Sequence, residues 1–308
     1  MPAQRQLLPD GRWHFQHGPI DLLIGAEGDS LALSHVHLAA WHRFETLLDE
    51  LVGELRLLRM PVTGSACPLQ GDVARCMWVA CHPYRAGFIT PMAAVAGAVA
   101  QTVIGCYRRE GITRAWVNNG GDIALHLTPG TSWRIGLFAD PTRFDPRTPL
   151  QVDAGFTVHA SLPVRGVATS GWRGRSFSLG IADSVTVLAR TAAEADAAAT
   201  VIANAVNLED DARIVRRPAC ELKDDTDLGT IPVTVDVPAL DEDAVRRALA
   251  AGERRARELQ ALGLIWSAVL CCQDRYVVVE AERRSQLPQI DATLPRMSVD
   301  RRVGSVFA

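Results

Sequence analysis

An uncharged run over residues 86–107, with an arginine at each end, restricts the fold more than any other feature of the sequence. The run is long enough to cross a membrane. It contains Thr90-Pro91 and Gly97, however, and small residues replace large aliphatic ones over much of its length. These features favour a helix packed closely inside a protein, with Thr90 as its N-cap and Pro91 at its first position. We therefore expect a soluble protein built around a buried helix.

Hydrophobic periodicity predicts the remaining elements. An opening hairpin is expected over residues 12–24, and a long amphipathic helix over 34–60 covers a sheet. Thr191 and Glu194 have the spacing of a capping box at the start of a further helix. Helices are also predicted over 192–206 and 242–262, and strands over 73–80, 112–117, 123–127, 134–138, 156–159, 165–168, 177–188, 264–272 and 276–280.

The order of a helix followed by a hairpin occurs twice, over residues 90–127 and 242–280. This repetition is weak evidence for an internal duplication. We expect a single domain over residues 1–280, followed by a polar C-terminal tail over 281–308 that is mobile or packs on a partner subunit. The tail is therefore the expected contact for a homo-oligomer or a protein partner.

Charge and cysteine usage exclude several classes of function. The net charge is −3, and the arginines are scattered along the chain, so nucleic acid and anionic membranes are poor partners. The seven cysteines form no CxxC pair, which argues against a disulfide framework and a zinc site and suits a reducing compartment. The N-terminus lacks the apolar core of a signal peptide, so a cytoplasmic location is expected.

A polar turn between two predicted strands is the first candidate site. It reads Asn118-Asn119-Gly120-Gly121-Asp122. Two successive glycines allow backbone amides to converge on an anion or a ring carbonyl. A tight hairpin turn explains the same residues equally well.

The second candidate is the strand end Gly166-Val167-Ala168-Thr169-Ser170-Gly171, followed by Trp172-Arg173-Gly174-Arg175. Its hydroxyls and open backbone lie at a strand end, the arginines can clamp a phosphate, and the tryptophan can stack on a ring. A surface turn with solvated arginines is the alternative. No acidic residue or histidine adjoins the hydroxyls, so an activated serine nucleophile is not indicated.

The third candidate is a polar stripe on the helix 192–206, whose other residues are nearly all apolar. Asp196, Thr200 and Asn204 are four residues apart and share one face. A carboxylate and a hydroxyl one turn apart can bind Mg²⁺ through hard oxygen atoms. The alternative, slightly favoured by the spacing alone, is that neighbouring loops satisfy these side chains.

Taken in order, these segments resemble the ApbE-like superfamily, whose best-known members are flavin transferases that move FMN from FAD to a protein threonine with Mg²⁺. Residues 119–123 resemble its Gly-Gly-Asn/Asp turn, 166–171 its Thr-Ser-Gly strand end, and 184–200 its strand and metal-binding helix. The resemblance implies Asp196 and Thr200 as metal ligands. It further implies an α+β protein with a duplicated tunnelling-type fold, in which helices cover antiparallel sheets.

Residues 90–98 and 225–229 are similar to segments of an uncharacterised branch of that superfamily. The Lys-Gly pair of the transferases reads Ala96-Gly97 in this chain. Their His-Ile-x-Asp-Pro stretch has lost its histidine and proline, since Leu179-Gly180-Ile181-Ala182-Asp183 leads straight into the next strand. These differences predict that the chain does not flavinylate proteins.

The leading hypothesis is a Mg²⁺-assisted enzyme, related to the FMN transferases, that acts on a small phosphorylated, nucleotide- or flavin-like molecule such as FAD or FMN. The alternatives are a non-catalytic flavin- or nucleotide-binding accessory protein and a structural relic of the scaffold. In the leading hypothesis the metal ligands are Asp196 and Thr200, and the ligand contacts are Asn119, Gly120, Gly121, Asp122, Thr169, Ser170, Gly171 and Arg173.

Overall fold

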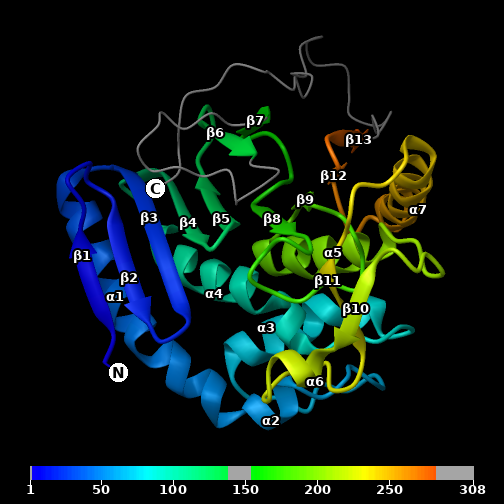
Figure 1. The fold of residues 1–308 in the computed structure, drawn as a ribbon. Coiled ribbons are helices and arrows are strands. Elements are labelled where there is room, and N and C mark those ends of the chain that lie inside the picture. The colour runs from blue at the N-terminus through cyan, green and yellow to red at the C-terminus, as the bar shows by residue number, and fades with distance from the viewer. Residues whose placement is uncertain (1, 138–153, 282–308) are drawn as a thin grey trace.

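The computed structural model describes residues 2–137 and 154–281. Its centre is a nine-stranded sheet in which every neighbouring pair of strands is antiparallel (Figure 1). The strand order is β1-β2-β3-β4-β5-β8-β9-β12-β13, and two short hairpins, β6-β7 and β10-β11, lie outside this sheet. The strands are β1 (Gln4–Leu7), β2 (Trp13–His17), β3 (Ile20–Gly28), β4 (Ile112–Asn119), β5 (Asp122–Leu127), β6 (Ser132–Leu137), β7 (Ala154–His159), β8 (Gly166–Ser170), β9 (Ser184–Ala189), β10 (Val215–Pro218), β11 (Pro232–Asp236), β12 (Ser267–Cys272) and β13 (Arg275–Val279).

Helices cover the sheet and confirm the predicted α+β class. The long first helix begins after Asp29, whose carboxylate accepts the amides of Leu31 and Ala32. Helices α4 and α5 lie side by side in the middle of the molecule, α4 against β4 and β5 and α5 against β8 and β9 (Figure 1). The helices are α1 (Ser30–Gly53), α2 (Leu55–Leu58), α3 (Asp72–Cys81), α4 (Val95–Ile104), α5 (Ala192–Ala205), α6 (Ala219–Leu222) and α7 (Glu242–Ala261), with 3₁₀ turns at His82–Tyr84, Pro91–Ala94 and Gly105–Tyr107.

The central strands are buried on both faces, because alternate side chains point to opposite sides of a strand. On β4, Ala115 and Val117 join the main core that the helices cover. Between them, Trp116 joins a second apolar cluster, to which Ile135 and Phe156 of the β6-β7 hairpin also belong. The strands that carry the candidate site are therefore held between two packed layers.

Several predicted elements are confirmed. The opening hairpin is β2-β3, and the two strands that flank the glycine-rich turn are β4 and β5. The hydroxyl of Thr191 accepts the amide of Glu194, as expected for the cap of α5. On β12, Cys272 is buried and Cys271 is half-buried, and all seven cysteines are free thiols. Helix α7 precedes β12-β13 as α4 precedes β4-β5, but internal duplication stays a prediction.

The predicted strand over 73–80 is wrong, because this segment is helix α3. Its buried side chains include Val73, Met77 and Cys81, which recur every four residues and form one helical face. The carboxylate of Glu54 accepts the amides of Gln70 and Gly71 and so fixes the entry to this helix. A short apolar run such as this one fits both the two-residue period of a strand and the 3.6-residue period of a helix. Packing against the core selects the helix.

Two further expectations require correction. The predicted strand over 177–188 begins only at Ser184, because the preceding residues pack against the end of α5, where the amide of Leu179 donates to Asn204. Thr90 stands before the 3₁₀ turn Pro91–Ala94 but makes no capping bond. Its hydroxyl instead donates to Asp227, a partner far along the chain that local spacing does not reveal.

The described residues contain no helix that is both long and apolar enough to cross a membrane. The buried helix predicted over 86–107 is α4 with its flanking 3₁₀ turns, and its residues Ala98, Val99 and Ala100 are fully buried. The predicted tail over 281–308 lies, apart from residue 281, outside the described residues, as does Phe138 at the end of one predicted strand.

Candidate functional site

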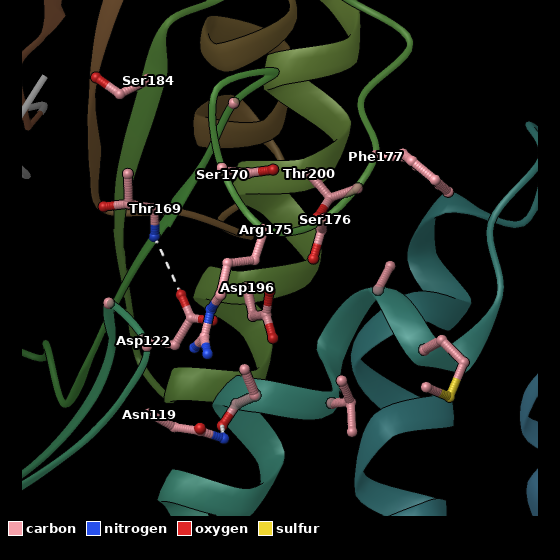
Figure 2. A pocket seen from close by; sticks show the side chains of 18 of the residues that line it. Asn119, Asp122, Thr169, Ser170, Arg175, Ser176, Phe177, Ser184, Asp196 and Thr200 are labelled. Atoms are coloured by element: carbon pink, nitrogen blue, oxygen red, sulfur yellow. Dashed lines mark hydrogen bonds between the residues drawn. The ribbon is translucent and has the colours of Figure 1, made fainter. Parts of the chain in front are cut away.

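A cavity of about 930 Å³ lies where β4 and β8 end and β5 and β9 begin, facing α4 and α5 (Figure 2). Antiparallel neighbours bring the turn between β4 and β5 beside the end of β8. Every residue that the sequence analysis selected for ligand or metal binding lines this cavity. They are Asn119, Gly120, Gly121, Asp122, Thr169, Ser170, Gly171, Arg173, Asp196 and Thr200.

Two carboxyl groups from separate elements converge in this cavity. Asp122 begins β5 and Asp196 lies in the second turn of α5 (Figure 2). Burial raises the pKa of Asp122 to about 7. The pKa of Asp196 lies well above its ordinary value, first because of burial and then because of the negative charge of Asp122. The site thus holds two neighbouring carboxyl groups that resist ionising together.

Close packing of two helices positions Asp196. The amide of Gly97, on α4, donates to Oδ2 of Asp196 at 2.9 Å. A Cβ atom on Gly97 would lie 2.3 Å from the carbonyl oxygen of Ala192, so only glycine allows α4 to approach α5 this closely. The side chain of Asn119 binds α4 at the adjacent residue, since its Nδ2 donates to the carbonyl of Ala96.

The turn between β4 and β5 contributes side chains to the cavity more than backbone amides that are free to bind a ligand. Gly120 and Gly121 have positive φ angles of 66° and 113°. The amide of Gly121 donates to Oδ1 of Asn118, so this donor is already used inside the turn. The turn does place Asp122, whose Oδ1 accepts the amide of Thr169 from β8 at 3.1 Å. The Gly121 amide is therefore engaged within the hairpin turn, and ligand binding by Gly120 and Gly121 stays a prediction.

The strand end at Thr169 and Ser170 also lines the cavity. Oγ1 of Thr169 lies 2.8 Å from Oγ1 of Thr186 on β9, so these two hydroxyls share a hydrogen bond. The side chains of Ser170 and Thr200 line the same cavity (Figure 2). β8 and α5 thus provide hydroxyl groups beside the two carboxyl groups.

The two arginines after β8 have different environments. Nε of Arg173 donates to Oδ1 of Asp183 at 2.8 Å, and its guanidinium lies 4.7 Å from the centre of the Trp172 ring. Trp172 donates to Asp183 as well and is not among the residues that line the cavity, and its stacking on a ligand ring stays a prediction. Arg175 reaches the cavity, and its positive charge lowers the pKa of Asp122 against the effect of burial.

Several residues on the far wall of the cavity were not predicted from the sequence as site residues. Arg59, Thr90, Lys223, Asp225 and Asp227 all line it. Arg59 pairs with Asp225 at 2.8 Å, and Thr90 donates to Asp227, so two contacts hold the segment 223–228 against the rest of the wall. In the sequence, this segment was indicated by the similarity of residues 225–229 to a segment of the uncharacterised branch. That similarity identified no role for these residues.

The donor set of the cavity suits a hard divalent cation bound partly by water. Within the described residues, no three His, Cys, Asp or Glu side chains are close enough to ligate a metal by themselves. Asp196 and Asp122 offer carboxylate oxygens, and Thr200 offers a hydroxyl one turn after Asp196. Such a set fits Mg²⁺, which prefers oxygen ligands and keeps several waters.

The nine-stranded antiparallel sheet, with α4 and α5 beside a carboxylate-containing cavity, defines an α+β protein. A family model described as AbpE bacteria matches residues 5–282, and the chain therefore belongs to this family. This result confirms the resemblance inferred from the motifs.

Several curated relatives carry the name UPF0280 protein. UPF0280 protein MK0206 of Methanopyrus kandleri is 38% identical over 210 residues, which are 67% of this chain and 78% of that protein. The relative from Methanospirillum hungatei is 36% identical over 133 residues, 43% of this chain and 51% of its own length. The relative from Methanothermobacter thermautotrophicus is 40% identical over 142 residues, 46% of this chain and 52% of its own length. The chain thus spans about half the length of these last two relatives.

Solved structures of ApbE proteins show a distant likeness. Pseudomonas stutzeri flavinyl transferase ApbE is 13% identical with a TM-score of 0.43, covering 91% of this chain and 94% of that chain. The ApbE protein from Thermotoga maritima is 12% identical with a TM-score of 0.40, covering 91% of this chain and 96% of that chain.

Proposed function

We propose that the chain is an enzyme that uses a divalent metal ion, Mg²⁺, to act on a small phosphorylated molecule of the nucleotide or flavin type. One observation carries the proposal: the buried Asp122 and the half-buried Asp196 line the same large cavity, where the charge of Asp122 raises the pKa of Asp196. A divalent cation removes that repulsion, so the arrangement is stable with a metal and costly without one.

The residues that would hold the metal are Asp196 and Thr200 on α5, with Asp122 across the cavity. Gly97 and the capped start of α5 orient the Asp196 carboxylate before any ligand binds. Mg²⁺ would supply positive charge to a phosphoryl oxygen, which stabilises negative charge that develops in a reaction.

The ligand class follows from the charges around the carboxyl groups. Arg175 and Lys223 line the same cavity, and Arg59 lies on its far wall beside Asp225. Guanidinium and ammonium groups near a metal suit the oxygens of a phosphate or a pyrophosphate. A cavity of about 930 Å³ has the size of a cofactor site and accommodates a nucleotide or flavin ring next to those groups.

Isothermal titration with FAD, FMN and ADP, each with Mg²⁺ and with EDTA, tests the proposal. We expect binding that requires Mg²⁺ and that Asp196→Ala abolishes, because this substitution removes a metal ligand. Asp236→Ala is the matched control, since Asp236 is an exposed carboxylate on β11 outside the cavity. Well-folded protein that binds none of the three ligands, or binds them equally after Asp196→Ala, would contradict the proposal.

A non-catalytic binding protein is the second candidate. The loss of the transferase lysine at Ala96-Gly97 favours it, since α4 here offers only small side chains and backbone at that position. Single-turnover assays with the ligand that binds best separate the candidates: consumption of the ligand supports the enzyme, and stoichiometric binding without consumption supports the accessory protein.

We further propose a cytoplasmic location and a single domain over residues 1–280.

A further inference from the structure

A second cavity, of about 880 Å³, lies at the opposite ends of the same four strands. It is bordered by the start of β4, the end of β5, the residue before β8 and the residues after β9. Strands of this length separate the two cavities by roughly 20 Å. The site described above therefore does not include this cavity. Its lining residues are Arg108, Arg109, Glu110, Gly111, Ile112, Thr113, Leu125, His126, Thr128, Arg165, Arg190 and Thr191.

The lining of this cavity contains a strong excess of positive charge. Four arginines line it, and Glu110 is the one acidic residue among the lining positions. Arg190 pairs with Glu194 at 3.1 Å, which neutralises part of the charge. Within residues 2–137 and 154–281, the side chains of Arg108 and Arg109 have no carboxylate within salt-bridge distance.

The excess of positive charge around this cavity contrasts with the chain as a whole, whose net charge is −3. Elsewhere on the surface, arginines commonly pair with carboxylates on the same or a neighbouring element. Examples are Arg43 with Glu50, Arg114 with Glu27, Arg213 with Asp211, Arg257 with Glu253 and Arg275 with Glu242. Arg108 and Arg109 are exposed, and like charges gathered around a hollow create a local positive potential that attracts small anions.

Arg165 is fixed at the base of this cavity. Its Nη1 donates to the carbonyls of Leu162 and Val164, and its Nη2 to that of Ala160, so the guanidinium cannot move away from its neighbours. Burial lowers the pKa of Arg165, and the charge of Arg108 lowers it further. Burial likewise lowers the pKa of His126, with smaller contributions from the charges of Arg108 and Arg165.

The hydroxyl groups beside the arginines are already engaged. Thr128 donates to the carbonyl of Thr113, and Thr113 donates to that of Glu27. Recognition in this cavity therefore depends on the guanidinium groups, which match the paired oxygens of phosphate. A hollow of this size favours a small molecule over an extended polymer, which would require a basic stripe along the surface.

We propose that this cavity, lined by Arg108, Arg109 and Arg165, is a second binding site for a small multivalent phosphate compound. The site does not depend on the metal or on the first cavity. It would hold a phosphate ester or pyrophosphate group at the ends of strands whose other ends carry Asp122 and Thr169.

Isothermal titration with inorganic pyrophosphate in EDTA tests this proposal, because EDTA removes the metal on which the first cavity depends. We expect the double variant Arg108→Gln/Arg109→Gln to bind about tenfold or more weakly than the wild type. The matched control is Arg56→Gln/Arg254→Gln, which removes the same charge from exposed positions outside both cavities and should bind like the wild type. Arg165 is left intact, since its bonds to three carbonyls support the fold.

Several outcomes would overturn the proposal. Wild-type protein that does not bind pyrophosphate, or a double variant that binds as tightly as the wild type, would show that the arginines form no phosphate site. Citrate that binds as tightly as pyrophosphate would show a site for anions in general. A DNA duplex that binds more tightly than pyrophosphate, through the same two arginines, would assign the cavity to nucleic acid.

Discussion

The backbone amide of Gly97 donates to the carboxylate of Asp196 across the contact between α4 and α5. One helix thereby supplies the hydrogen bond that orients the proposed metal ligand of the other. The contact depends on the missing side chain of Gly97, which leaves room for the carbonyl of Ala192. The small residues of the uncharged run therefore serve the site as well as the core.

Gly97→Ala should destabilise the protein and weaken metal-dependent binding. The added methyl group would lie 2.3 Å from the carbonyl oxygen of Ala192, so α4 and α5 must separate. We expect a loss of about 2 kcal/mol in the free energy of unfolding, measured with urea. Gly105→Ala is the control, because a Cβ atom there meets nothing within 4 Å and should leave stability nearly unchanged. Equal stability of the two variants would contradict the close contact.

The stability of the metal-free protein should fall as the pH rises from about 4 to about 7. The pKa of Asp122 is raised to about 7 in the folded protein, so the unfolded chain releases this proton more readily. Stability from the protonated group is thus complete below its ordinary pKa and lost as the pH passes 7, by at most a few kcal/mol. Urea unfolding in EDTA at several pH values measures this loss in the free energy of unfolding.

Asp122→Asn should remove most of that pH dependence, whereas Asp236→Asn on the exposed face of β11 should preserve it. Mg²⁺ should stabilise the wild type increasingly over the same range, because it competes with protons for the carboxylates. Stability that rises with pH in EDTA and is unaffected by Asp122→Asn would refute the environment assigned to Asp122.

Arg175 and Arg173 should respond differently to substitution. Arg175 faces the cavity without an ion-pair partner in the described part of the chain, so Arg175→Gln should weaken ADP binding about tenfold and leave stability unchanged. Arg173 pairs with the buried Asp183, so Arg173→Gln should lower stability by about 1 kcal/mol. Titration calorimetry measures ADP binding and urea unfolding measures stability, each on both variants. Identical changes in the two variants would contradict the different roles assigned to Arg175 and Arg173.

Thr90→Val should loosen the far wall of the cavity. Thr90 is almost fully buried and donates to Asp227, so valine leaves that carboxylate without its partner. We expect a loss of about 1 kcal/mol in stability and weaker ADP binding, both restored by Thr90→Ser. Thr102→Val is the control, since the Thr102 hydroxyl donates to the carbonyl of Ala98 in its own helix and lies outside the cavity. Hydrogen exchange over residues 223–229 should rise in Thr90→Val alone.

The positions of single elements could be predicted from the sequence where a local period was strong. The apolar runs of β4 and β5 and the glycine-rich turn between them place their hairpin correctly, and the four-residue spacing of Asp196 and Thr200 places both side chains on one face of α5. Backbone geometry determines these relationships within a few residues, so no distant contact is needed to recognise them.

The tertiary structure alone decided which side chains meet. It made the segment 73–80 a helix, and it directed Arg173 to Asp183 and Arg175 toward the cavity. It also brought Asp122 to Asp196, which the spacing of motifs could only suggest. These outcomes depend on how whole helices and strands bury their apolar faces against each other, and local periodicity carries no information about that choice. The sequence by itself thus determined the residue types of the site and those elements with a strong local period, and packing determined the remaining elements and the arrangement of all of them.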